Sequence, residues 1–399
     1  MGFGKLADSF KKESPYKVFL WTIVMTGLAY GLYKGIIDNY LAEIVGVGEV
    51  GKGVTEFFRE LPGVLLVFIL AAFYTLSAES LYKVGAIVML VGLGMHAILP
   101  PSQVLITIAI FIMSAGDHIQ LGMKNTLTLS YSHPGRGGVA LGLQNSFHAI
   151  GMLFGYIVVA IVFSLIVGNQ PFKVFLWIST ALCAVSAILS LKIQGNNKQD
   201  PTKRRFYFKK KFYKYYMLEI FYGARKQVFF TFGPYVLILF YGAKTTHMAI
   251  LFAISSIATF LLSPLVGRII DKLGYKIVMI SDTLILVIVC FFYGFAHRLF
   301  PMDVAFIVCC INYVLDSVIS LASLASNVYV QDISDNEDEM KATISTGVSV
   351  NHLITIFIAL CGGWIWKALG IETLFIVSAV LGLCNSAYAA TIKVPKKAQ

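Results

Sequence analysis

The chain has 399 residues, of which 57% are hydrophobic and 14% aromatic, and its mean hydropathy is +0.77. This composition leaves too little polar surface for a soluble globule, so we expect an integral membrane protein. At about 20 residues per spanning helix, the length accommodates about twelve spans and excludes an appended soluble enzyme domain. The net charge of +11 is assigned to cytoplasmic loops, and nucleic-acid binding is not expected.

Twelve hydrophobic runs follow one another in two groups of six. They lie at 17–41, 54–77, 81–99, 103–130, 138–168 and 172–193, and then at 215–241, 246–267, 276–296, 302–330, 341–369 and 371–392. The pattern predicts an all-α membrane protein with an N-terminal six-helix bundle (1–193), a basic cytoplasmic linker (194–214) and a C-terminal six-helix bundle (215–399). The first run is too long for a signal-peptide core, so we expect it to be retained.

The basic residues predict the orientation in the membrane. Twenty-two Lys and Arg fall on the side shared by both termini, against six on the other side: Lys52, Arg59, Lys173, Lys244, Arg298 and Lys367. This asymmetry predicts a multi-pass protein of the cytoplasmic (inner) membrane with both termini in the cytoplasm. The basic segment 195–214 is either a simple linker or a site for anionic lipid.

The six cysteines all lie in apolar runs without metal-ligand spacing. We therefore expect no disulfide, zinc site or other cofactor. Glycine steps at Gly27-Gly31-Gly35 and Gly151-Gly155 predict close packing between helices. We expect a monomer.

The two halves share residues at a slowly growing offset, which indicates an internal duplication. The matched pairs are Tyr30 and Lys34 with Tyr222 and Lys226, Tyr82 with Tyr275, Asp117 with Asp316, and His148 with His352. Because each half holds an even number of spans, the two bundles are expected to be pseudo-symmetric parallel repeats.

Two links between spans carry family motifs. Residues Gly267 to Lys276 (GRIIDKLGYK) resemble the signature G-x-x-x-D-[RK]-x-G-x-[RK] of the major facilitator superfamily, and Pro134 to Gly142 resemble its P-x-x-R-G-x-A-x-G pattern in shortened form. The corresponding link of the first half, Tyr74 to Lys83, lacks the Gly and Asp. The resemblance implies a secondary transporter with twelve spans that works by alternating access.

The signature predicts a cytoplasmic charge latch. Its members are Gly267, Arg268, Asp271, Lys272, Gly274 and Lys276, with Arg136 in the related link. Arg268, Lys272 and Lys276 are expected to face the acidic loop, which holds Asp332, Asp335, Glu337, Asp338 and Glu339. The alternative is an ordinary surface charge pattern.

Four bases, Lys34, Lys124, Arg225 and Lys226, lie within spans, where charge is costly and normally functional. Lys34 and Lys226 occupy equivalent repeat positions and are predicted to clamp an anion. Organic-phosphate transporters of the superfamily are similar in placing bases on spans 1 and 7. The predicted binding residues are Tyr30, Lys34, Tyr222, Arg225, Lys226 and Asn312. The alternative is that Lys34 pairs with Asp38 and that Arg225 or Lys226 pairs with Glu219.

Carboxylates and histidines within the spans form a second candidate set. They are Asp117, His118, His148, Glu219, Asp316 and His352. A carboxylate beside a histidine titrates near neutral pH, as proton coupling requires. The alternatives are a path for a transition-metal ion and hydrogen bonds that only pack helices.

The sequence therefore predicts a secondary active transporter for a small organic anion of the carboxylate, phosphate or sulfonate type, coupled to protons or to exchange. Three alternatives remain: proton-driven efflux of cationic or amphipathic drugs, transport of a metal ion, and a non-transporting sensor or lipid-translocating scaffold. We expect no enzyme, because the chain lacks a P-loop, a nucleotide fingerprint and a nucleophile elbow.

Overall fold

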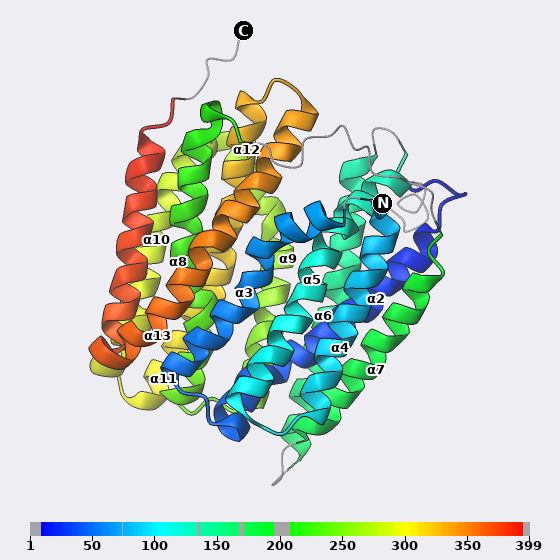
Figure 1. Cartoon of the computed structure of the whole chain (residues 1–399). Coiled ribbons are helices and arrows are strands. Elements are labelled where there is room, and N and C mark those ends of the chain that lie inside the picture. The colour runs from blue at the N-terminus through cyan, green and yellow to red at the C-terminus, as the bar shows by residue number, and fades with distance from the viewer. Residues whose placement is uncertain (1–8, 74, 134–135, 167–170, 195–207, 394–399) are drawn as a thin grey trace. The chain divides into compact units, whose positions relative to one another are not determined.

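The computed structural model describes residues 9–73, 75–133, 136–166, 171–194 and 208–393. These residues fold almost entirely into helices and divide into two compact units (Figure 1). The first unit takes those within Met1–Gly46, Leu65–Lys203 and Lys244–Ala253, and the second takes those within Val47–Val64, Arg204–Ala243 and Ile254–Gln399. Helices α3 (Glu49–Ala72) and α9 (Thr245–Leu273) therefore contribute to both units.

In the first unit, the first helix packs on the last two. Helix α2 (Tyr16–Asn39), which continues into a π-helical turn at Tyr40–Val45, contacts α6 (Gly137–Leu165) and α7 (Phe172–Leu191). Helix α4 (Ala78–Ile98) contacts α5 (Gln103–Tyr131) and α7. A Cβ atom added to Gly31 would lie 2.3 Å from the carbonyl oxygen of Met152, so α2 and α6 touch through their backbones. This confirms the close approach predicted from the glycine steps.

The second unit repeats this arrangement. A 3-10 turn at Lys210–Phe212 leads into α8 (Tyr213–Leu239), which packs on α13 (Glu337–Ala390). Helix α10 (Tyr275–Leu299) contacts α13 and α11 (Met302–Ile319), and α8, α10 and α13 run side by side in Figure 1. A second 3-10 turn, Ser320–Ser323, joins α11 to α12 (Leu324–Ile333).

Helix α13 consists of two spans. Its 54 residues are interrupted at Gly370, whose φ of +88° is a conformation that a side chain disfavours. Helix α8 meets both spans: Gly347 packs on Tyr215 before the break, and the Ser378 hydroxyl donates to the Arg225 carbonyl oxygen after it. Helix α2 in the first unit and α8 in the second thus each pack on two later spans of the same unit, which agrees with the predicted duplication.

The predicted twelve spans can be followed in the described residues. Nine helical stretches in this part of the chain are long and apolar enough to cross a membrane, and one of them, Ala342–Ala390, contains the Gly370 break. Helices α3 and α8 have 24 and 27 residues, also sufficient to span a membrane, but they carry clustered charges. Counting α3, α8 and both parts of α13 gives twelve spans in an all-helical membrane protein.

Candidate functional site

A small pocket of about 20 Å³ lies between α2, α4, α5 and α6 in the first unit. Two predicted residues, Asp117 and His148, line it together with the base Lys124. Asp117 and Lys124 are two turns apart on α5, so they share one face of the helix. The other lining residues are Ile23, Thr26, Tyr82, Gln120 and Leu121. The pocket is lined by both polar and apolar side chains, and its one acid and one lysine balance in charge.

His118 is not part of this lining. Its Nδ1 lies 2.8 Å from the carbonyl oxygen and 3.1 Å from the hydroxyl of Ser114, one turn earlier on α5. Both contacts are local to the helix, and the His118 side chain is buried.

A second pocket lies between α8, α10, α11 and the following 3-10 turn in the second unit. It gathers four predicted residues, which are Tyr222, Arg225, Lys226 and Asp316, and it is completed by Leu286, Ile319 and Ser320. The Tyr222 hydroxyl donates to the Ser320 carbonyl oxygen at 2.7 Å, and the Arg225 guanidinium carbon lies 4.9 Å from the centre of the Tyr222 ring. These contacts fix one wall of the pocket.

The two bases of this pocket differ in environment. Arg225 is buried and forms an ion pair with Asp282 on α10, a residue that the sequence analysis did not single out. Lys226 is exposed, and no hydrogen bond or ion pair of its side chain occurs among the described residues. Lys226 is therefore the base available to a ligand, whereas the charge of Arg225 is already compensated.

The other predicted binding residues make local contacts. The Lys34 ammonium group donates to Asp38 at 3.0 Å, as their spacing of four residues predicts, and lies 5.8 Å from the centre of the Phe252 ring. Tyr30 contacts the ring of Tyr33 on the same helix. Asn312 is buried, and its amide donates to the Val308 carbonyl oxygen at 2.8 Å.

Glu219 is buried near the start of α8 and does not form the predicted pair with Arg225. Its carboxylate accepts from the Ser326 hydroxyl at 2.9 Å and from the Asn351 amide at 3.3 Å. These bonds connect α8 with α12 and α13. The side chain therefore joins three helices of the second unit.

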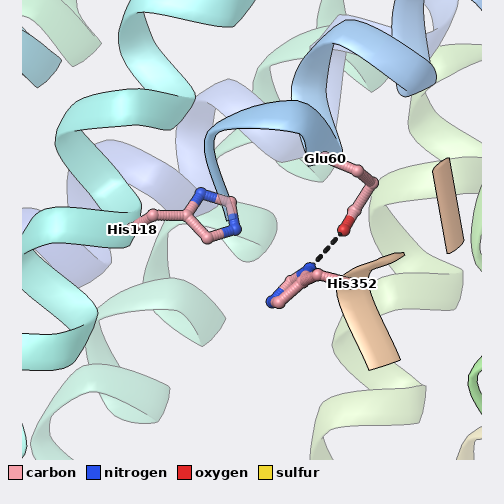
Figure 2. A group of neighbouring side chains, drawn as sticks. All are labelled: Glu60, His118 and His352. Atoms are coloured by element: carbon pink, nitrogen blue, oxygen red, sulfur yellow. Dashed lines mark hydrogen bonds and ion pairs between the residues drawn. The ribbon is translucent and has the colours of Figure 1, made fainter. Parts of the chain in front are cut away.

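The sequence analysis missed a chain of charges in the second unit, here called the α3 network and made up of Lys52, Glu56, Arg59, Glu60 and His352. Lys52 pairs with Glu56 at 2.8 Å, Glu56 with Arg59 at 2.5 Å, and Arg59 also pairs with Glu60. His352 Nδ1 lies 2.8 Å from the Glu60 carboxylate (Figure 2). The spacing of Lys52, Glu56 and Glu60 by four residues is the signal in the sequence that could have identified its first part.

The α3 network changes the count of basic residues outside the membrane. Lys52 and Arg59 were counted on the side opposite the termini, but both lie within α3, and Lys52 is only 2% exposed. Aromatic rings of α8 cover the two bases: the Lys52 ammonium lies 5.2 Å from the centre of the Tyr235 ring, and the Arg59 guanidinium lies 4.6 Å from that of Phe230. Lys52 is a buried ion-pair partner and Arg59 a partly buried one, rather than solvated loop residues.

The signature link forms a tight turn between α9 and α10. Gly274 has a φ of +83° directly before α10, which confirms the expected role of a glycine there. Gly267, Arg268, Asp271 and Lys272 lie in the last turns of α9, and the last three are exposed. Lys276 donates to the Ile392 carbonyl oxygen at 2.9 Å, and Arg136 is exposed directly before α6.

The acidic loop is bound by the end of the basic linker. Lys209 and Lys211 lie 2.7 and 2.5 Å from Glu339, and Lys211 also lies 2.8 Å from Asp335. Partial burial lowers the pKa of Lys211, but its bonds to Asp335 and Glu339 raise it more, so the pKa is above its ordinary value. No ion pair of Arg268 or Lys272 occurs in the described part of the chain. The predicted lipid site falls mostly on 195–207, outside the described residues.

Comparisons with known proteins agree with this fold. Residues 216–399 match the Major Facilitator Superfamily. The nucleoside transporter NupG has a TM-score of 0.73 at 17% identity, covering 94% of this chain and 99% of NupG. A D-xylose-proton symporter has a TM-score of 0.73 at 13% identity, covering 95% and 97%. The human organic anion transporter MFSD10 has a TM-score of 0.64 at 10% identity, covering 94% and 98%. The sequence has no significant match among curated proteins.

Proposed function

We propose that this chain is a member of the Major Facilitator Superfamily and a secondary active transporter that moves a small organic anion by alternating access. Membership in this superfamily, together with the apolar helices, makes the chain a multi-pass membrane transporter. The anionic substrate and the mode of coupling are our inferences from the charged side chains. The excess of bases near the two termini supports placing both ends in the cytoplasm.

The observation that carries the proposal is the state of Lys226. Of the predicted binding bases, Lys34 is paired with Asp38, and Arg225 is paired with Asp282. Lys226 is the exposed base of the second pocket and shares it with Asp316. An ammonium group in a site of reduced polarity attracts a carboxylate, phosphate or sulfonate, and it repels a cationic drug.

The surrounding residues give the site its shape. Tyr222 is held by its bond to Ser320, and its ring lies under Arg225. These fixed groups can orient an organic anion while Lys226 supplies the charge. Asp316 in the same pocket provides a counter-charge for Lys226 when no anion is bound. Proteins of the same fold include the human organic anion transporter MFSD10 and a D-xylose-proton symporter.

A thermal-shift screen of the purified protein tests the proposal. The probes are a dicarboxylate, a sugar phosphate, an alkyl sulfonate and the lipophilic cation tetraphenylphosphonium. We expect at least one anion to raise the Tm of the wild type, because a ligand that binds only the folded protein stabilises it. Lys226→Gln should lower the affinity for that ligand at least about tenfold. Lys173→Gln, the same change at an exposed base on α7, should leave the affinity unchanged.

The same screen distinguishes the alternatives. Lys34→Gln should also lower the affinity for the anion if Lys34 and Lys226 act together as a clamp. A Tm shift with tetraphenylphosphonium and with none of the anions would contradict the proposal and favour efflux of cations. Equal anion affinity in the wild type and Lys226→Gln would show that the assignment of Lys226 is wrong.

A further inference from the structure

A buried carboxylate of the first unit lacks a partner among the described residues. Glu79 lies in the first turn of α4 and is 1% exposed, and neither of its carboxylate oxygens takes part in a hydrogen bond there. Lys83, one turn later, donates no hydrogen bond to it, and the Lys11 ammonium donates instead to the Ser130 carbonyl oxygen at 2.9 Å. An uncompensated buried charge is costly, so a group in this state indicates an ion that completes its contacts.

Two buried hydroxyl groups at the same end of the unit also lack hydrogen-bond partners in the described part of the chain. Tyr131 is the last residue of α5, and its phenol interacts electrostatically with Glu79. Ser9 accepts, at its backbone carbonyl, a bond of 2.9 Å from the amide of His133, two residues after Tyr131. Oxygen atoms are the ligands of hard cations, and this end of the unit therefore offers a carboxylate and two hydroxyl groups for one.

The chain directly before α2 is fixed at this end of the unit. Residues 9–14 are here called the N-terminal strap. Phe10 of the strap forms an isolated antiparallel bridge with Ser132. Its side chain is buried in the same hydrophobic cluster as Ala78, the first residue of α4, and Tyr131. The strap therefore packs beside both the start of α4 and the end of α5.

We propose that Glu79, Tyr131 and Ser9 bind an alkali-metal cation, Na⁺ or K⁺, beneath the N-terminal strap. A single carboxylate with neutral hydroxyl groups compensates one positive charge, whereas sites for divalent cations commonly gather several carboxylates. The first turn of α4 favours the ionised carboxylate, because the N-terminus of a helix carries a partial positive charge. The second pocket, to which we assign the anion, belongs to the other unit, so the cation site goes beyond the proposed function and does not depend on it.

The sequence at Glu79 differs from the superfamily signature. Aligning Tyr82 with Tyr275, a matched pair of the two halves, brings Glu79 opposite Lys272. Lys272 is exposed and occupies a position at which the signature has a base, whereas Glu79 is a buried acid. A base would repel a cation, so binding of a cation here would be a property of this chain and not of the signature.

Binding of the cation and docking of the strap are linked. Because Ser9 supplies one of the oxygens, a bound cation holds the strap in place, and a docked strap raises the affinity for the cation by the same factor. The Phe19 ring lies 5.5 Å from the rings of both Tyr131 and Tyr82, and Tyr82 lines the first pocket. Phe19 therefore connects the cation site with a wall of that pocket.

Binding of radioactive tracers to the purified full chain in choline chloride tests the site. The tracers are ²²Na⁺ and, for K⁺, ⁸⁶Rb⁺. We expect the wild type to bind at least one of them saturably. Glu79→Gln keeps the size of the side chain but removes the charge, and it should lower the affinity at least about tenfold. Glu13→Gln, the same change at an exposed acid of the strap, should leave the affinity unchanged.

The outcome decides the proposal in either direction. Saturable binding of neither tracer to the wild type, or equal affinity in the wild type and Glu79→Gln, would overturn it. If Glu79→Gln fails to fold, Tyr131→Phe and Ser9→Ala each remove one hydroxyl group and should lower the affinity. Equal affinity in the wild type and both hydroxyl variants would then refute the site.

Hydrogen exchange tests the link to the strap. The amides of Lys11 and His133 close the backbone bonds between the strap and the end of α5. Replacing choline chloride by the salt of the bound cation should slow exchange of these amides in the wild type and not in Glu79→Gln. Equal slowing in Glu79→Gln would show that the cation acts elsewhere.

Failure of the anion assignment is distinguishable from failure of the cation site. Neither measurement uses an organic anion, so both remain decisive if the Tm screen finds no anion that binds. Lys226→Gln alters the second unit and should retain the wild-type affinity for the tracer.

Discussion

Removing the carboxylate of Asp282 should destabilise the protein strongly. Asp282 and Arg225 form an ion pair between α10 and α8, and their side chains are 7% and 4% exposed. Arg225 Nη1 is a buried atom with no hydrogen-bond partner in the described structure, so its partner on α10 carries much of the compensation. In Asp282→Asn, the guanidinium stays charged and buried, but the opposite charge is lost.

The structure sets the size of the effect. Leaving one member of a buried ion pair without its partner costs about 3–5 kcal/mol. A contrasting pair in the same unit is Arg298 with Glu372, in which the Arg298 side chain is 66% exposed. Because solvent screens that pair, Arg298→Ala should cost at most about 1 kcal/mol. The double substitution Arg225→Met with Asp282→Leu should recover most of the loss, since it removes both charges together.

Unfolding of the purified protein in detergent, followed by intrinsic fluorescence, provides the free energies. The wild type, Arg225→Met, Asp282→Leu and the double variant together give the coupling energy of the pair. The reasoning fails if Asp282→Asn is no more destabilising than Arg298→Ala. It fails equally if the effects of Arg225→Met and Asp282→Leu are additive.

Three further predictions concern packing, backbone and the linker. Gly31→Ala should cost about 1–3 kcal/mol in unfolding free energy, because the new Cβ would lie 2.3 Å from the Met152 carbonyl oxygen; a neutral result would contradict the close approach. Gly370→Ala should cost about 1–2 kcal/mol, because φ there is +88°, and an unchanged Tm would argue against this turn. Lys211 has a raised pKa, so its stabilising bond to Glu339 is fully present below the ordinary lysine pKa and is lost as pH rises through the raised value. The Tm of Lys211→Ala should therefore be slightly lower than that of the wild type at neutral pH and equal to it at strongly alkaline pH.

Hydropathy was sufficient to predict the order of the spans, because each span must be apolar over about 20 residues whatever its neighbours are. Ion pairs within one helix could also be predicted from the sequence: Lys34 and Asp38 are one helical turn apart, and the pair forms as their spacing predicts. Ion pairs between helices that lie far apart in the sequence could not be predicted in this way. Glu60 and His352 are separated by 292 residues, and only the packing of α3 on α13 brings them together. For Arg225, the sequence offered Glu219 one to two turns away, whereas the fold supplies Asp282 from α10.

Two buried ion pairs each lie within a single unit. Lys34 and Asp38 belong to the first unit, and Arg225 and Asp282 belong to the second. In the proposed transport cycle, movement of one unit past the other would therefore leave these two pairs intact, and neither pair would have to be exposed to water during that step. The rate of the conformational cycle should consequently depend little on ionic strength as far as these four charges are concerned, since salt acts mainly on charges that reach the solvent.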